Sequence, residues 1–161
     1  MMGLNYEEFE NDLDGGWRQL GNTLGCEAET AKLIRTYRIE KIEAQRRSLL
    51  HHEAQLLGAA GDYEAAAATL RTLIPLVTDP TMLYYHEAEL AFFLRNRAAL
   101  KDARKSLSAL PQPDWFERSA EAFKQAYPGS PAPVWPLNLD VVDGLIRCFD
   151  RPYAEAYQRV C

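Results

Sequence analysis

The nine prolines of this 161-residue chain are unevenly distributed, and all of them lie at or beyond Pro75. Proline lacks a backbone N–H and clashes with the preceding helical turn, so a long stretch without it can run as helices interrupted only by glycine and capping residues. No run of residues alternates between apolar and polar side chains with the period of two that a strand requires, so we expect no sheet. The sequence therefore predicts an all-α fold.

The N-terminal segment carries an apolar stripe with intervals of three or four residues, which predicts one buried helix face after an N-cap at Asn5. The stripe consists of Phe9, Leu13, Trp17, Leu20 and Leu24. Gly15 and Gly16 weaken its middle, so a kink or break can occur there. A second helix should begin near Glu27, but residues 38–45 contain no breaker that would set its end.

Three later residues are strong helix N-cap candidates, namely Asp62, Asp79 before Pro80, and Asn96. With Gly61 and Pro75 as end signals, they predict helical hairpins over residues 46–76 and 80–110. Further helices over residues 114–160 surround a proline-rich connector, and we expect them to fold back as a C-terminal cap. A degenerate hairpin over residues 6–40 would complete a single domain spanning residues 1–161.

The two hairpins repeat each other in one constant register, which aligns HEAQL at residues 52–56 with HEAEL at residues 86–90. The same register pairs Leu49 with Leu83, Asp62 with Asn96, Ala65 with Ala99, and Leu73 with Leu107. Because a single hairpin cannot bury its own apolar face, such repeats are expected to stack.

This segment resembles the tetratricopeptide repeat (TPR) family, whose helical hairpins recur with a period of about 34 residues, which is also the offset from His52 to His86. Residues 61–63 and Ala66 resemble the family's inter-helix turn, and Ala54 and Ala88 occupy its small-residue position. Glu53 and Glu87 depart from the family's usual leucine. The resemblance implies TPR-like stacked hairpins of the right-handed α-solenoid type with a C-terminal helical cap.

The same resemblance implies a concave partner-binding face on the inner helices of the two hairpins. Its positions are Ser48, His51, His52 and Gln55 in the first hairpin, and Met82, Tyr85, His86, Glu89 and Phe93 in the second. Such a mixture of histidine, aromatic and amide side chains is typical of protein-binding surfaces. Two alternatives stay open, because the C-terminal helices could cover this face, and the basic second helix could be the binding surface instead.

The sequence contains no motif that predicts catalysis. HEAQL and HEAEL begin like the zinc-binding H-E-x-x-H helix but end in leucine, and the phosphate, dinucleotide and nucleophile-elbow loops are absent. We therefore expect no catalytic residues, no cofactor and no metal site. The alternative is a helical metal-binding protein or enzyme that uses His51, His52 and His86, which the repeat could bring together.

Charge and cysteine usage narrow the partners and the compartment. A net charge of −5 argues against nucleic acid as a partner, and no run of 18 apolar residues could span a membrane. The acidic start of the chain lacks the pattern of a secretory signal. The odd count of three cysteines fits a reducing compartment, with Cys148 as a small buried hydrophobe. We therefore expect a cytoplasmic protein.

Taken together, these features predict a small, acidic, non-catalytic interaction module that binds another protein. Neutralisation of a cognate toxin, as an immunity protein does, ranks first among its roles. The alternatives are a secretion chaperone, a self-associating structural repeat, and the metal-binding protein or enzyme described above.

Overall fold

The computed structural model describes residues 1–41 and 46–161, and within these ranges the chain forms helices and no strand. The all-α prediction is therefore confirmed. The elements are a π-helix η1 (Glu7–Asn11), α1 (Arg18–Gly21), α2 (Glu27–Lys41), α3 (Arg46–Ala59), α4 (Tyr63–Leu73), a 3₁₀-helix η2 (Ile74–Leu76), α5 (Pro80–Phe93), α6 (Arg97–Ser108), α7 (Phe116–Ala126), α8 (Leu139–Arg147) and α9 (Tyr153–Gln158). In the described part of the chain, no helix combines the length and apolar character needed to cross a bilayer.

The three N-caps expected for α4, α5 and α6 are confirmed. The side chains of Asp62, Asp79 and Asn96 each accept a hydrogen bond from the backbone N–H three residues further on, at 2.9–3.1 Å. These bonds satisfy donors that a helix start would otherwise leave unpaired. The second predicted helix, α2, runs to Lys41, and residues 42–45 of the stretch without a breaker lie outside the described residues.

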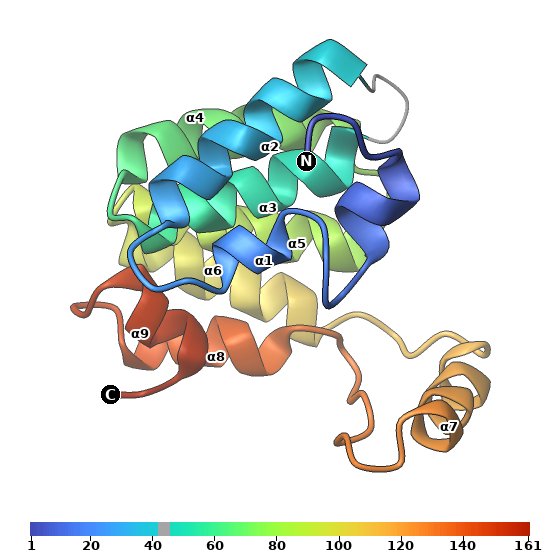
Figure 1. Cartoon of the computed structure of the whole chain (residues 1–161). Helices are drawn as coiled ribbons and strands as arrows, with labels where there is room; N and C mark the ends of the chain where they lie inside the picture. Colours follow the sequence, from blue (N-terminus) through green and yellow to red (C-terminus); the bar gives the residue numbers. More distant parts are fainter. Residues whose placement is uncertain (42–45) are drawn as a thin grey trace.

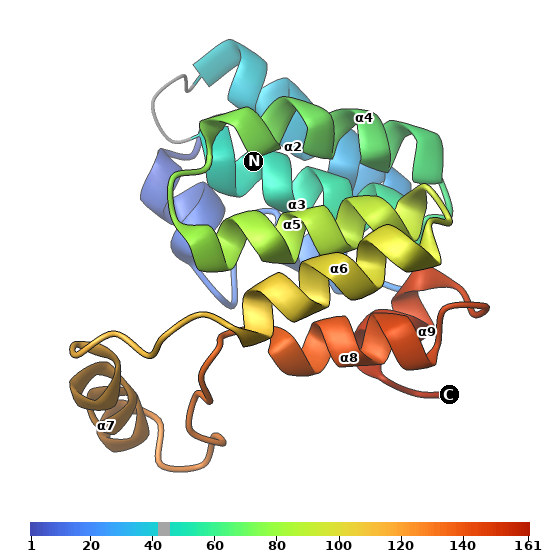
Figure 2. The same cartoon turned by 180° about the vertical axis from the view of Figure 1, so that it is seen from behind.

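Consecutive helices pack against one another along the chain. The helix α3 lies against α2 and α4, and α5 lies against α4 and α6, as the two opposite views show (Figures 1 and 2). Farther along, α8 packs on α5 and α6, and α9 contacts both α8 and α3. The main core between these helices contains the fully buried residues Leu50, Leu70, Phe92, Leu107 and Leu145.

The N-terminal segment differs from the predicted continuous helix. Phe9 and Trp17 are buried, but Leu13 is 66% exposed and Leu24 is 95% exposed, so the stripe does not form one face. The chain turns at Gly16, which has a φ of +53° and leaves no room for a Cβ against the Phe9 carbonyl. The Phe9 ring instead stacks on Tyr37 of α2 at 3.7 Å between centroids.

The helices that follow Leu110 divide into two groups. While α8 packs on α5 and α6, and α9 on α3, α7 stands away from these helices in both opposite views (Figures 1 and 2). We call residues 111–137 the arm and the rest of the described chain the body. At its base, the indole N–H of Trp135 donates a hydrogen bond to the Leu110 carbonyl at 3.0 Å. The expectation that all C-terminal helices fold onto the last hairpin is therefore wrong for α7.

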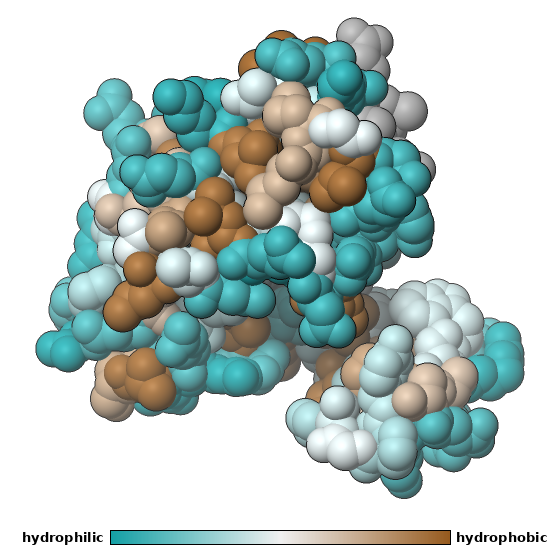
Figure 3. Space-filling view, in the orientation of Figure 1, coloured by the Kyte–Doolittle hydropathy of each residue, from teal (hydrophilic) through white to brown (hydrophobic). Residues whose placement is uncertain are grey.

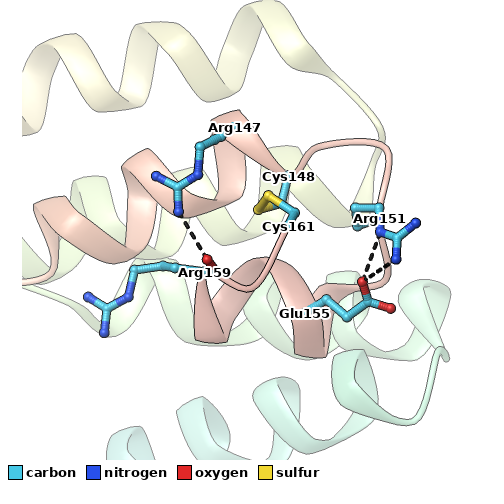
Figure 4. The surroundings of a disulfide bond; sticks show 6 residues. All are labelled: Arg147, Cys148, Arg151, Glu155, Arg159 and Cys161. Atoms are coloured by element: carbon cyan, nitrogen blue, oxygen red, sulfur yellow. Dashed lines mark hydrogen bonds and ion pairs between the residues drawn. A yellow bond between two sulfur atoms is a disulfide. The ribbon is translucent and has the colours of Figure 1, made fainter.

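The C-terminal end of the chain is tied to α8 by a disulfide between Cys148 and Cys161 (Figure 4). Cys148 is buried, as expected, but its pairing with Cys161 was not expected from the cysteine count. Cys26 carries a free thiol. Near the disulfide, the Arg147 guanidinium donates to the Arg159 carbonyl at 3.2 Å, and the Arg159 side chain pairs with Asp140 of α8, so these contacts and the disulfide hold the segment after α9 on α8.

Candidate functional site

The structure brings the eight predicted partner-binding residues together where α3 faces α5. Three of them come from α3 and five from α5, and all belong to the equivalent helices of the two hairpins. They are His51, His52, Gln55, Met82, Tyr85, His86, Glu89 and Phe93. The His86 ring there meets the His51 ring, with 4.5 Å between the ring centroids, and not its repeat equivalent His52.

These residues do not form an exposed groove. Tyr85, His86, Glu89 and Phe93 are buried, and the other four are partly buried. From one side α9 covers them, because the Tyr153 ring packs 4.7 Å from the Phe93 ring. The expected partner face is thus used inside the molecule, where its aromatic side chains gain more from mutual burial than from contact with water.

The N-terminal segment covers the other end of this face through Trp17 and Glu10. The Trp17 ring lies 4.9 Å from the His52 ring, and a carboxylate oxygen of Glu10 lies 2.8 Å from His52 Nδ1. Glu10 also accepts hydrogen bonds from the Trp17 indole at 2.7 Å and from the Ser48 hydroxyl. Burial alone would raise the pKa of Glu10, but the close approach and charge of His52 outweigh it and lower that pKa.

Glu89 is the centre of the buried polar contacts, with 0% of its surface exposed. Its Oε1 accepts hydrogen bonds from the Tyr153 hydroxyl at 2.6 Å and from the Gln55 amide at 3.1 Å. Its Oε2 lies 3.3 Å from His51 Nε2 and 3.4 Å from His86 Nδ1. We call His51, His86 and Glu89 the histidine–glutamate cluster.

Protonation in this cluster is shaped by burial. Desolvation alone would raise the pKa of Glu89, but the charge and close approach of His51, followed by the hydrogen bond with His86, hold it well below its usual range. Desolvation lowers the pKa of His51, although Glu89 opposes that shift. Burial also raises the pKa of Tyr153, which keeps its hydroxyl protonated as a donor to Glu89. The cluster therefore combines an ionised carboxylate with an imidazole whose neutral form is favoured.

A surface pocket of about 220 Å³ reaches this cluster from outside. His51 and His86 line it together with residues that include Ser48, Asp79 and Met82. The pocket therefore gives a small molecule or ion access to the side chains of two of the three cluster residues. Among the described residues, the side chains of the histidine–glutamate cluster are the ones whose donor atoms converge closely enough to hold a metal ion.

A third buried carboxylate explains one departure from the TPR pattern. Glu53, at the family's leucine position, is buried and accepts hydrogen bonds from Arg35 at 2.9 Å and Arg38 at 2.7 Å. Both arginines belong to α2, so part of its basic charge is used to hold α2 on α3. This pairing weakens the case for α2 as a binding surface for an acidic partner.

The contacts of Glu10 with His52 and of Tyr153 with Glu89 could not be predicted from the sequence. Glu10 lies among acidic residues that look like a solvated helix face, and its partners His52 and Ser48 are far from it along the chain. Tyr153 reaches Glu89 only because α9 folds back over α3 and α5. In contrast, the spacing of His86 and Glu89 on one helix face was visible in the sequence.

Comparison of the chain with protein-family models, with curated proteins and with solved structures found no match in any of the three. Function is therefore inferred from the residues and their geometry alone.

The arm carries the two most exposed of the large aromatic side chains in the described part of the chain. Trp115 is 48% exposed and Tyr127 is 51% exposed, and both flank the amphipathic helix α7. Phe116 packs under Trp135 at 5.3 Å between ring centroids, which gives the arm a small aromatic core of its own. The space-filling view shows the arm as a separate lobe beside the body (Figure 3).

Proposed function

We propose that this protein is a non-catalytic interaction module that binds another protein through the arm. The observation that carries the proposal is the display of α7 on a lobe that stands away from the body, with Trp115 and Tyr127 half exposed at its two ends. Aromatic side chains dominate the binding energy of protein interfaces, and a short amphipathic helix is a common ligand of an apolar groove. The arm therefore replaces the inner groove as the proposed binding surface.

The body, in this proposal, is a TPR-like stack that positions the arm. Support comes from the equivalent capping roles of Asp62 and Asn96 in the two hairpins, and from the pairing of α3 with α4 and of α5 with α6. The right-handed solenoid arrangement and the role of α8 and α9 as a C-terminal cap are parts of the same proposal.

The test begins with identification of the partner by chemical cross-linking of the full chain in its own cells, followed by affinity measurement with the purified partner. The double variant Trp115→Ser/Tyr127→Ser removes both exposed aromatics. Loss of a hot-spot residue costs about 2 kcal/mol or more, so we expect binding to weaken by roughly 30-fold or more. Leu24→Ser is the matched control, because Leu24 is 95% exposed on the body.

Circular dichroism should show that both variants keep the helical content of the wild type, because none of the three side chains lies in the main core. If the double variant binds the partner as tightly as the wild type, the arm is not the binding surface. If Leu24→Ser weakens binding equally, the effect is not specific to the arm.

Neutralisation of a toxin is the specific role that we place first within this function, because a small acidic domain with a net charge of −5 that engages one protein is sufficient for it. Deletion of this reading frame should then impair growth only while a neighbouring toxin gene is intact. Unimpaired growth beside an active toxin would exclude this role.

The cytoplasm remains the proposed place of action, and the Cys148–Cys161 disulfide, a type of bond that is rare in a reducing compartment, makes this proposal testable. Thiol blocking in intact cells, followed by mass spectrometry, should find Cys148 and Cys161 blocked in a reducing compartment. Recovery of the Cys148–Cys161 pair from freshly blocked cells would place the protein in an oxidising one.

A further inference from the structure

The histidine–glutamate cluster has the composition and spacing of a metal site. Its three donor atoms, from His51, His86 and Glu89, lie within 4.8 Å of one another. His86 and Glu89 are three residues apart on α5, so one helix face presents both, and His51 approaches from α3. Imidazole nitrogens combined with one carboxylate oxygen are a common donor set for zinc in proteins.

The distances from the carboxylate to the two imidazoles match those of a tetrahedral ion. Zinc–nitrogen and zinc–oxygen bonds of about 2.1 Å at tetrahedral angles separate neighbouring ligand atoms by about 3.4 Å. Glu89 Oε2 lies 3.3 Å from His51 Nε2 and 3.4 Å from His86 Nδ1. Both separations are long for a hydrogen bond, and the geometry at His51 Nε2 leaves that buried atom without a hydrogen-bond partner.

The surroundings orient the carboxylate for this role. The Tyr153 hydroxyl and the Gln55 amide both bind Oε1 of Glu89, which leaves Oε2 directed toward the two histidines. Such outer hydrogen bonds fix the orientation of a ligating carboxylate in metalloproteins. His52 is excluded from the set, because its Nδ1 lies against Glu10 instead.

Three protein ligands leave one coordination position of a tetrahedral zinc ion open, and the pocket beside His51 and His86 has room for the ligand that would fill it. The pocket also offers an entry path, and its volume of about 220 Å³ leaves room for a water molecule as a fourth ligand. We propose that His51, His86 and Glu89 bind one zinc ion that links α3 to α5, with the fourth coordination position facing this pocket. The proposal goes beyond protein binding by the arm and stands independently of it.

The test uses the full chain purified without a histidine tag and treated with a chelator that is then removed. Titration with zinc should show one ion bound per chain and a rise in the thermal midpoint of unfolding, because the ion binds only the folded arrangement. Cobalt in place of zinc should produce the intense visible absorption of a tetrahedral site. Failure of the folded wild type to bind zinc would overturn the proposal.

Two variants identify the ligands. Glu89→Gln keeps the shape of the side chain, and His86→Asn replaces the imidazole by a carboxamide, which is a poor zinc ligand. Each should weaken zinc binding by roughly 100-fold or more, since loss of an outer partner alone costs about 10- to 100-fold. His52→Gln is the matched control and should retain one zinc. Undiminished affinity in both ligand variants would refute the assignment.

A second measurement keeps the ligand assignment testable if either variant fails to fold. In wild-type protein, the imidazole NMR signals of His51 and His86 should move on addition of zinc in equal amount, and those of His52 should stay in place. A shift confined to His52, or no shift at all, would contradict the site.

Discussion

Gly58 of α3 lies against side chains of both α5 and α9, and replacing it by alanine brings two opposing effects into play. A Cβ added at Gly58 would lie 2.5 Å from two atoms of the Phe93 ring and 3.1 Å from the Tyr153 ring. Alanine is favoured over glycine inside a helix by about 1 kcal/mol, whereas overpacking a well-filled core costs about 1–3 kcal/mol.

We expect the steric cost to be larger, because neither ring has free space to move into. The Phe93 and Tyr153 rings are both buried and pack 4.7 Å apart, with Gly58 beneath them. With the overpacking cost in the upper part of its range, about 2–3 kcal/mol, and a helix gain of about 1 kcal/mol, Gly58→Ala should lower the free energy of unfolding by about 1–2 kcal/mol. Urea denaturation followed by circular dichroism measures this change directly.

The double variant Gly58→Ala/Phe93→Leu shows whether the ring is the cause. Shortening Phe93 removes the atoms that the new Cβ would meet, so the two changes should cost less together than the sum of their separate costs. A coupling of about 1 kcal/mol or more is expected for residues in contact. If Gly58→Ala is as stable as the wild type, or more stable, the close approach of α3, α5 and α9 is not as described.

Three further predictions concern the buried carboxylates. Tyr153→Phe should lower stability by about 1.5–3 kcal/mol in urea denaturation, the usual contribution of a hydrogen bond to a charged group, because its hydroxyl donates to Glu89 at 2.6 Å. Stability should fall as the pH drops below 4.5, because Glu10 has a lowered pKa in the folded state and its stabilising contribution is lost as the pH falls through that folded-state pKa. Glu10→Gln should therefore be less stable than the wild type at neutral pH and should lose less stability on acidification. Thermal midpoints measured over a series of pH values check both expectations. Glu53→Gln should cost about 1–3 kcal/mol by leaving Arg38 without its counter-charge, and an unchanged urea midpoint would show that this ion pair is not formed.

Helix existence was predictable from the sequence because its determinants are local. Asp62, Asp79 and Asn96 each cap a helix through a bond to a residue three positions away, so a short window contains the whole signal. The stripe that includes Leu13 and Leu24 failed because spacing gives the periodicity of a helix but not its continuity. The helix η1 ends at Asn11, so Leu13 lies in the connection after it, and the positive φ of Gly16 redirects the chain before Trp17 returns to pack in the same cluster as Phe9.

The candidate site was predictable only in part. The repeat identified α3 and α5 as equivalent helices and so brought His51 and His86 close, with 4.5 Å between ring centroids. What the repeat could not supply were the elements outside it, namely the segment that carries Glu10 and the helix that carries Tyr153. Each reaches the site through a tertiary contact between distant parts of the chain, and no local pattern encodes such a contact.

The hydrogen bond between Trp135 and the Leu110 carbonyl gives the chain a modular construction. It brings the two ends of the arm together at the edge of the body, so the arm is an insertion between α6 and α8 whose ends are joined by a hydrogen bond. Helices α6 and α8, which precede and follow the arm, pack directly against each other. The body and the insertion can therefore change separately: one scaffold can carry arms of different length and surface chemistry while its own core stays intact.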